Sequence, residues 1–455
     1  MNNYQSWLSW DEQAQLTEAL QRPLPASLRL NTLKITPDIA RQRWGYGWHI
    51  EPIPFCEAGW QLTAYDMPPS RTLEYRMGYY YIQDAASMLP AEVFSPHRAP
   101  LILDLAAAPG GKTTHLVDRF HDQGFIVAND SSTKRITALR SNLQTWGATG
   151  IMLTNYSGER FGTWFPETFD KVLLDAPCSG DTLREDKGRK KREVSAKEQS
   201  ALAERQLALA ISAFRALKVG GELVYATCTL NPTEDEGVLD TLLKTYPNAA
   251  IVETIDHLPI QAPALAIEGH HPSVRHALRL WPYLYHTSGF FTARIRKTDQ
   301  VPSHYEPPPY QEPDWQPLKQ ADQWQDELAQ RYGFTQALPT LWQKGELIYA
   351  IPSELSEELM DVPNMGMGLL VGQMQDGQII PSHELITRYE RQFTEGRLTI
   401  SEADCQIWLE GRDLRQTVDA PSGAVMLLED EQGRFVGRGK VLRDRIRNLL
   451  PKRVT

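Results

Sequence analysis

The sequence predicts an α/β protein organised around a doubly wound parallel sheet. Between residues 96 and 298, apolar runs that suit buried strands alternate with stretches of helical periodicity, as in successive β-α-β units. A glycine-rich turn connects one of these strands to the helix that follows it. The chain has 455 residues, which is too many for one hydrophobic core, so further domains are expected outside the sheet.

The stretch 101–114, with the sequence LILDLAAAPGGKTT, lies at the centre of this pattern. Residues 101–107 are apolar without polar alternation, as in a strand buried on both faces, and 109–111 form a Pro-Gly-Gly turn. A helix is expected next, with Thr113 or Thr114 at its N-cap. Glycine lets a ligand approach the free amides at the start of a helix, so this corner is predicted to bind a cofactor.

Three kinds of cofactor use a corner of this type. A P-loop for nucleoside triphosphates needs a glycine five residues before Gly111, but Ala106 stands there, and the G-x-G-x-x-G turn of dinucleotide sites is also absent. A nucleotide-like ligand without a pyrophosphate remains, and S-adenosylmethionine (SAM) fits. The strand expected at 126–130 ends in Asp130, which is placed to bind the ribose; alternatively, Asp130 caps the helix that begins near Ser131.

Further strands and helices complete the expected core. One amphipathic helix is expected over 202–217, ended by a glycine pair, and another over 234–246. The first turn of the second helix carries three acids, which are favourable at the positive end of the helix dipole. The remaining strands are expected at 150–155, 170–175, 222–227 and 289–296.

Two cysteines follow two of these strands. Cys178 lies in the segment 175–180 (DAPCSG), and Cys228 comes directly after the strand 222–227. Ligands of open parallel sheets bind at the carboxyl ends of the strands, so both thiols are expected to face the methyl donor. A lone cysteine usually fills a core, but two at equivalent strand ends indicate chemistry.

Cytosine is a substrate that needs a thiol. Its carbon 5 is a poor nucleophile, but a thiolate that adds to carbon 6 moves electron density to carbon 5, which then attacks the methyl group. Asp175 is placed to bond the polar edge of the base or to stabilise its protonated ring; alternatively, it caps the loop that follows. The second cysteine is expected to assist release of the product.

Together, these motifs resemble the RNA cytosine-5 methyltransferases of the NOL1/NOP2/Sun family. The resemblance covers roughly residues 20–298 and implies a Rossmann-like class I SAM methyltransferase core. It also implies that Cys228 is the nucleophile, that Cys178 releases the product, and that Asp175 lies near the reacting centre, where it contributes to both catalysis and donor binding. The segments that carry the resemblance are 29–32, 81–87, 103–112, 175–180, 227–232 with 234–236, and 289–291.

The same resemblance implies the donor site. Asp130 is expected on the ribose of SAM. The family usually has Asp-Gly-Arg after the third strand, whereas this chain has Ser-Gly-Glu at 157–159, so Ser157 is expected to meet the adenine end with a hydroxyl and donor binding is expected to be weaker. The donor is expected to lie against Ala106, Ala107, Ala108, Pro109, Gly110, Gly111 and Lys112.

The chain is expected to contain four domains and a linker. Its C-terminal extension resembles the bacterial RsmF type within the family, which methylates 16S ribosomal RNA. The aromatic run Tyr79–Tyr81 suits either base stacking or packing at a domain junction. The expected parts are a small α+β N-terminal RNA-recognition domain (1–95), the methyltransferase core (96–298), a proline-rich linker (299–319), a small intermediate domain (320–375) and a PUA-like RNA-binding domain (376–455).

Charge and composition limit the possible partners. The net charge of -10 argues against general coating of nucleic acid, so phosphate contacts are expected at two local basic clusters, 184–192 and 434–453; solvated basic surface is the alternative for each. The first residues lack the basic-then-apolar pattern of a signal peptide, no apolar run reaches membrane length, and the four cysteines lack metal-ligand spacing. We therefore expect a cytoplasmic protein with reduced thiols and with neither a membrane partner nor a metal.

The expected partner is ribosomal RNA, within the small subunit. The target base must be unstacked or flipped so that sulfur can reach carbon 6. Two alternatives stay open at this point: a transfer RNA cytosine-5 methyltransferase, and a non-catalytic RNA-binding protein of ribosome assembly.

Overall fold

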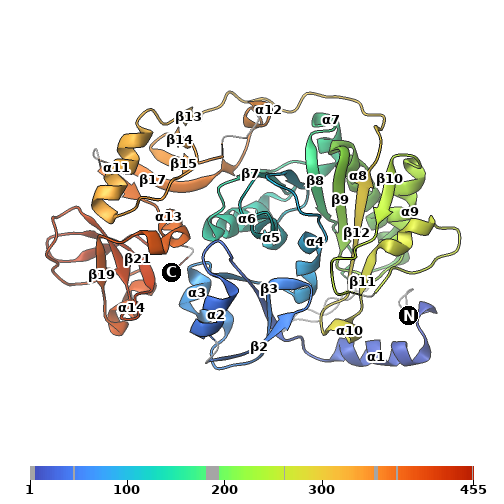
Figure 1. Ribbon diagram of the computed structural model, residues 1–455, viewed down its shortest axis with the longest axis horizontal. Helices are drawn as coiled ribbons and strands as arrows, with labels where there is room; N and C mark the ends of the chain where they lie inside the picture. The colour runs from blue at the N-terminus through green and yellow to red at the C-terminus, as the bar shows by residue number, and fades with distance from the viewer. Residues whose placement is uncertain are drawn as a thin grey trace.

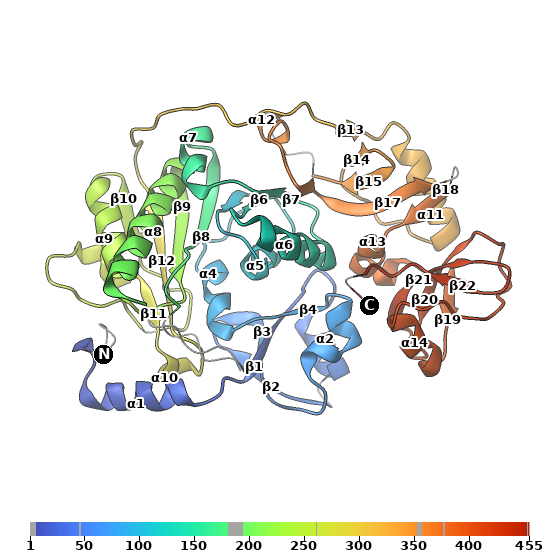
Figure 2. The same ribbon diagram turned by 180° about the vertical axis from the view of Figure 1, so that it is seen from behind.

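The computed structural model describes residues 6–44, 47–180, 194–260, 262–352, 357–375, 378–452 and 454. Within these ranges the strands form four sheets, which follow one another from the blue N-terminal part to the red C-terminal part of Figure 1. In Figure 1, and from behind in Figure 2, the two C-terminal units lie beside one end of the central sheet and the N-terminal domain lies below it. Among the described residues, no helix combines the length and the apolar character that crossing a membrane requires.

The central sheet has nine strands in the described part of the chain, with the order β10-β12-β9-β8-β5-β6-β7-β16 and β11 paired with β12. Strands β5 to β9 pair in parallel, and β12 is antiparallel to β9. The predicted doubly wound core is therefore confirmed. The strands are β5 (Leu101–Asp104), β6 (Phe125–Asn129), β7 (Ile151–Thr154), β8 (Phe169–Asp175), β9 (Leu217–Thr227), β10 (Ala250–Glu253), β11 (Leu278–Leu280), β12 (Phe290–Lys297) and β16 (Gly366–Met367).

Helices cover both faces of this sheet, because successive residues of its strands point to opposite sides. In β8, Val172 and Leu174 pack with Phe214 of α8 on one face, whereas Leu173 packs with Leu143 of α6 on the other. This two-sided burial explains the uninterrupted apolar runs of the sequence. The helices of the core are α4 (Leu89–Glu92), α5 (Gly111–Arg119), α6 (Thr133–Trp146), α7 (Phe161–Trp164), α8 (Ala196–Ala216), α9 (Glu236–Thr245) and α10 (Pro282–Tyr285).

The start of α5 differs from the prediction. The helix begins at Gly111, and its N-cap is Gly110, whose φ of 111° is a left-handed conformation that favours glycine. Thr113 and Thr114 are not caps. The Thr113 hydroxyl donates to Asp104 at 2.7 Å, and Thr114 accepts from Arg29 at 2.7 Å. Both threonines therefore connect the helix to neighbouring elements instead of starting it.

The N-terminal domain is a four-stranded antiparallel sheet that is fastened to the core through Arg29. This residue is fully buried, forms an ion pair with Asp118 of α5 and lies 4.5 Å from the ring of Trp146. Of the aromatic run, Tyr79 donates to Glu390 at the junction with the C-terminal region, whereas Tyr80 is 2% exposed and packs in the core of the N-terminal domain itself. The elements are α1 (Trp10–Gln21), β1 (Ala26–Leu30), α2 (Pro37–Trp44), β2 (Trp48–Ile53), β3 (Cys56–Tyr65), α3 (Leu73–Arg76) and β4 (Tyr80–Ile82).

Two further sheets make up the C-terminal region. The first contains β13 (Gln316–Pro317), β14 (Leu341–Lys344), β15 (Leu347–Ala350), β17 (Leu369–Gln375) and β18 (Gln378–Pro381), with helices α11 (Ala321–Tyr332), α12 (Glu357–Met360) and α13 (His383–Arg388). The second contains β19 (Arg397–Thr399), β20 (Val425–Glu429), β21 (Phe435–Val441) and β22 (Ile446–Asn448), with α14 (Glu402–Leu409).

The C-terminal boundaries expected from the sequence differ from these sheets. Strand β13 lies inside the expected linker 299–319 and pairs with β14. The expected boundary between 375 and 376 falls within the paired strands β17 and β18. The two-residue strand β16 joins the central sheet by pairing with β7. These domain boundaries depend on pairing between strands that are distant in the sequence, and local sequence patterns do not predict such pairing.

Ion pairs fasten the C-terminal region to the rest of the molecule. Arg388 of α13 pairs with Asp122 of the core at 3.3 Å, and Arg434 of the last sheet pairs with Glu74 of the N-terminal domain at 2.9 Å. Arg76 also donates to the backbone oxygen of Val454, which is 3% exposed. In both ribbon views these units lie beside α6 and the N-terminal domain.

Candidate active site

A cavity of about 520 Å³ opens at the carboxyl ends of β5, β6, β8 and β9. This is the topological switch point of the sheet, because the chain runs from β5 to β6 on one side and reaches β8 and β9 on the other. The structure brings six of the predicted site residues together in its lining. They are Ala106, Lys112, Asp130, Asp175, Cys178 and Cys228.

The turn between β5 and α5 forms one wall of the cavity and is held by backbone contacts. Ala107 donates its amide to the carbonyl of Asn129 at 2.7 Å, and Asn142 donates to the carbonyl of Pro109 at 2.8 Å. Gly111 is packed closely, since a Cβ atom there would lie 3.0 Å from Gln83 Oε1. The turn is therefore rigid, and its small residues leave room for a ligand.

Asp130 both supports this wall and faces the cavity. Its Oδ2 accepts the amide of Ala108 at 3.1 Å, and its Oδ1 accepts the amide of Ser132 at 2.8 Å. Helix α6 begins at Thr133 with Ser132 as its N-cap residue and without a side-chain cap, so Asp130 fixes the turn before the helix and is not its cap. A carboxylate has about four lone-pair positions. The two amides use two of those on Asp130, and Arg135 Nη1 lies 3.5 Å from Oδ2, so about one acceptor position is left for a ligand hydroxyl.

Ser157 lies beside the cavity, at the start of a short 3-10 helix (Gly158–Arg160). Its hydroxyl donates to the side chain of Glu159, so this hydroxyl already has a partner within the protein. The next residue, Gly158, lines the cavity, and a Cβ atom there would come within 2.7 Å of Leu209 Cδ2.

The two cysteines lie side by side. Cys178 Sγ and Cys228 Sγ are 2.9 Å apart, and the backbone amide of Cys228 donates to Cys178 Sγ at 3.3 Å. The hydrogen bond with Cys228, burial and the charge of Asp175 all raise the pKa of Cys178 well above its usual value. Cys178 is therefore a thiol, not a thiolate, near neutral pH.

Lys112 and Asp175 form an ion pair that the sequence reasoning missed. Lys112 Nζ lies 2.6 Å from Asp175 Oδ2 and 5.3 Å from the centre of the Phe290 ring. Burial works to lower the pKa of Lys112, but the attraction of Asp175 outweighs it and raises the pKa, so the lysine is cationic. The adjacency of β5 and β8 was the available signal, since both residues follow the ends of these two strands.

The three acids expected in the first turn of a helix have a different role. Helix α9 begins at Glu236, and Glu234, Asp235 and Glu236 are all fully buried. Asp235 accepts the Thr227 hydroxyl at 2.6 Å, and Arg279 pairs with both Asp235 and Glu236. These acids are therefore bound by side chains of the core instead of facing solvent at a helix end.

The predicted phosphate-binding clusters are only partly visible. The cluster 184–192 lies outside the described residues. In the C-terminal cluster, Arg434 pairs with Asp430 at 2.7 Å, Arg445 pairs with Asp413 at 3.1 Å, and Arg438 donates to the carbonyl of Pro381 at 2.5 Å. Lys440 and Arg447 face each other across β21 and β22, and they are the basic pair of this sheet that suits an anionic partner.

The cavity at the switch point, the rigid small-residue turn and the acid after the second strand define a class I methyltransferase. The donor set fits SAM, because Asp130 lies at the cavity as an acceptor for a ribose hydroxyl and the turn is built from small residues that leave its backbone accessible. Comparison with known proteins makes the assignment more specific. Residues 91–296 match the family model of 16S rRNA methyltransferase RsmB/F, and residues 1–85 match the N-terminal domain of 16S rRNA methyltransferase RsmF.

Relatives that span nearly the whole chain agree with these matches. Ribosomal RNA small subunit methyltransferase F of Aeromonas salmonicida is 34% identical over 98% of this chain and 93% of its own length. The protein of the same name from Escherichia coli O157:H7 is also 34% identical, with the same coverage. The chain therefore belongs to the ribosomal RNA small subunit methyltransferase F family. The predicted family, enzyme class and methyl donor are thereby confirmed.

Solved structures agree on the fold. A methyltransferase homologue from Pyrococcus horikoshii is 33% identical with a TM-score of 0.57, covering 65% of this chain and 92% of its own. NSun6 from the same organism, solved with SFG, is 22% identical with a TM-score of 0.56, covering 65% of this chain and 97% of its own. The second likeness bears on the fold alone.

Proposed function

We propose that this protein uses SAM to methylate carbon 5 of a cytosine in 16S ribosomal RNA. The observation that carries the proposal is the pair of thiols 2.9 Å apart inside the cavity at the switch point. Two adjacent thiols match a reaction in which one sulfur is bonded to the base while another group assists its release. The names of the full-length relatives support small-subunit ribosomal RNA as the substrate.

Cys228 is assigned as the nucleophile. Its sulfur forms a bond to carbon 6 of cytosine, and the electron pair of the C5–C6 double bond moves toward carbon 5. SAM supplies an electrophilic methyl group, to which carbon 5 then bonds. Loss of the proton from carbon 5 restores the double bond and expels the Cys228 thiolate, so atoms and charge balance.

Cys178 is assigned to this release step. It lies in contact with Cys228, and its raised pKa makes it a thiol in the resting enzyme, so it can give its proton to the departing Cys228 sulfur and take up the proton of carbon 5 in exchange. A group with these properties suits proton transfer beside the breaking sulfur–carbon bond better than it suits the first attack. The assignment therefore separates the two cysteines by the step in which each takes part.

Asp175 and Lys112 are assigned to the polar edge of the base. Both line the cavity and their charges neutralise each other, so together they present a hydrogen-bond acceptor and a cation close to Cys178. A base that gains electron density at its ring needs a donor or a proton there, which this pair supplies. Ala106 to Lys112, Asp130 and Asp175 are assigned to the donor, with Ser157 close to its adenine end.

The remaining parts of the chain are assigned to RNA binding. The N-terminal domain covers the core beside the donor turn, and the last sheet carries the pair Lys440 and Arg447, which suits phosphate contacts. We assign a PUA-like role to this last unit and place the activity in the cytoplasm. The target cytosine has to leave its stack to reach Cys228, at a cost of a few kcal/mol that backbone contacts offset.

The proposal is tested by transfer of a labelled methyl group from SAM. The substrates are unmodified 16S RNA, assembled small subunits and transfer RNA, and the product nucleotide is identified and mapped. We expect 5-methylcytidine in one of the two ribosomal substrates. Label in transfer RNA alone would overturn the substrate, and an absence of label in all three together with an absence of SAM binding by calorimetry would overturn the catalytic function.

A further inference from the structure

A buried carboxylate, Glu234, connects the two loops that carry the cysteines. It is fully buried and lies in the segment after Cys228. Its Oε2 accepts the backbone amide of Ser179, the residue after Cys178, at 2.9 Å. Its Oε1 accepts from Asn231 at 3.4 Å. One side chain thus contacts both cysteine loops.

A second buried side chain, Gln206 of α8, holds this carboxylate from behind. Its Nε2 donates to Glu234 Oε2 and to the carbonyl of Pro177, each at 2.9 Å. The backbone of Glu234 is fixed as well, because the Tyr225 hydroxyl donates to its carbonyl oxygen at 2.6 Å. The residues on either side of Cys178 are therefore tied to one rigid point.

We propose that Glu234, held by Gln206, is a positioning residue that sets the contact between Cys178 and Cys228. The inference rests on the proposed function for its purpose, since a base-release step needs both sulfur atoms within reach of one base. Glu234 does not line the described cavity, and it acts through the loop that it anchors. Its two buried neighbours, Asp235 and Glu236, are arranged differently, since both pair with Arg279.

The physical reason is the cost of unmade hydrogen bonds. Removing the carboxylate leaves the Ser179 amide and one Gln206 N–H without an acceptor. Each donor that stays away from water without an acceptor destabilises this arrangement by its desolvation free energy. The segment 177–179 then relieves this cost by moving, and Cys178 moves with it. A glutamine at 234 keeps one acceptor oxygen, so its effect is smaller than that of alanine.

The test measures the proximity of the two thiols without RNA or donor. Treating the full-length protein with diamide, a diazene oxidant, removes two electrons and two protons from adjacent thiols to give a disulfide and the hydrazine. Peptide mapping under non-reducing conditions gives the rate at which the Cys178–Cys228 disulfide appears. We expect Glu234→Ala to slow this rate at least tenfold and Glu234→Gln to slow it severalfold, at a temperature where circular dichroism shows each variant folded.

Glu236→Gln is the matched control, because Glu236 is also fully buried and lies two residues away, but its side chain contacts Arg279 and the amide of Leu265 instead of the Cys178 loop. We expect its oxidation rate to stay within twofold of the wild type. Folded Glu234 variants that oxidise as fast as the wild type would overturn the inference, and so would a wild-type protein that forms no such disulfide. A wild-type protein that oxidises as expected but transfers no methyl group would refute the proposed function alone.

Discussion

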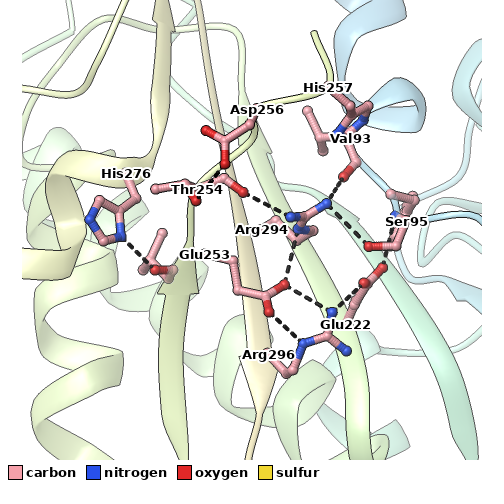
Figure 3. Close-up of polar contacts among 12 residues, drawn as sticks. Val93, Ser95, Glu222, Glu253, Thr254, Asp256, His257, His276, Arg294 and Arg296 are labelled. Carbon is pink, nitrogen blue, oxygen red and sulfur yellow. Dashed lines mark hydrogen bonds and ion pairs between the residues drawn. The ribbon is translucent and has the colours of Figure 1, made fainter.

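Strand β9 passes through two polar clusters that use buried charge in different ways. At its carboxyl end lies the cavity with Cys228, and roughly 16 Å earlier along the strand, at about 3.3 Å per residue, lies Glu222. Figure 3 shows the second cluster, in which Glu222 and Glu253 alternate with Arg294 and Arg296 across β9, β12 and β10.

The ion pair at the centre of this cluster is enclosed by protein, because the side chains of Lys171 and Glu222 are each 3% exposed, whereas Arg296 and Glu253 at its rim are 31% and 25% exposed. Glu222 binds Lys171 at 2.6 Å and Arg296 at 2.7 Å, and it accepts the amide of Ser95 at 3.1 Å. Arg294 donates to the carbonyls of Val93 and Thr254 and pairs with Glu253, as the dashed lines of Figure 3 show. Such a network fixes the edge of the sheet.

The cluster at the cavity is paired but open. The side chains of Lys112 and Asp175 are 14% and 31% exposed, whereas those of Lys171 and Glu222 are both 3% exposed. A buried ion pair matters for stability because removing one partner leaves the other charge buried and unpaired. A partly exposed ion pair can also offer hydrogen-bond donors and acceptors to a substrate. The comparison predicts that changes at the cavity affect the reaction and changes at the closed cluster affect stability.

The largest expected effect is at Cys228. Replacing it by serine removes the sulfur nucleophile, and we expect methyl transfer to fall by at least about 10⁴-fold, as for other nucleophile variants. The melting temperature is expected to stay within a few degrees of the wild type, because the residue is half-buried and serine is similar in size. Transfer of labelled methyl and calorimetry measure the two quantities. Near-full activity in Cys228→Ser would refute the assigned nucleophile.

Glu222→Gln is expected to have the opposite effect, a loss of stability without a loss of activity. It leaves Lys171 buried without its charge partner, and we expect the free energy of unfolding to fall by about 3–5 kcal/mol. Methyl transfer well below the melting temperature is expected to be close to the wild type. The double variant Glu222→Gln with Lys171→Met is the control, and it should recover part of the loss because no unpaired lysine remains. Equal stability of wild type and single variant in urea would break the comparison.

Cys178 is expected to show a smaller effect of a different kind. In Cys178→Ala the bond to carbon 6 forms but release is impaired, so turnover should fall about 10²-fold. Enzyme and RNA should then accumulate as a covalent adduct when SAM is present, visible as a shifted band on a denaturing gel. An absence of adduct, with Cys228 intact, would mean that the two cysteines exchange or share their roles.

The closed cluster also predicts a dependence of stability on acid. Burial works to raise the pKa of Glu222, but the ion pair with Lys171 and the hydrogen bonds from Ser95 outweigh it and lower the pKa to about 2. The unfolded chain has the ordinary value of 4.5, so this stabilisation is complete above about pH 4.5 and is lost as the pH falls toward 2. Urea unfolding between pH 3 and 6 should show a steeper acid loss for the wild type than for Glu222→Gln.

Much of the core could be predicted from the sequence, because its strands have a strong local signal. Apolar runs such as 170–175 occur where both faces of a strand are buried, and the rule that ligands bind at strand ends placed Cys178 and Cys228 in one cavity.

The predictions were wrong or incomplete where contacts with residues distant in the sequence determine the structure. Thr113 has the local character of a cap, but its hydroxyl bonds Asp104 on another element. The pairing of Lys112 with Asp175 and the contacts of Glu234 depend on segments that are far apart in the chain. Strands β13 and β16 have two residues each, so only their partners define them. Local patterns cannot report such contacts.

The smallest expected effect is at Ser157, where the resemblance implied a weaker donor contact. Its hydroxyl already donates to Glu159, so Ser157→Ala removes an exposed hydrogen bond worth about 1 kcal/mol or less. We expect the dissociation constant of SAM, measured by calorimetry, to rise no more than about fivefold. Asp130→Asn is the contrasting variant, because it replaces one of the two oxygens that accept the amides of Ala108 and Ser132 and removes the charge at the cavity, and it should weaken donor binding far more. A loss at Ser157 as large as that at Asp130 would mean that the hydroxyl leaves Glu159 for the donor, which would make this residue a direct donor contact.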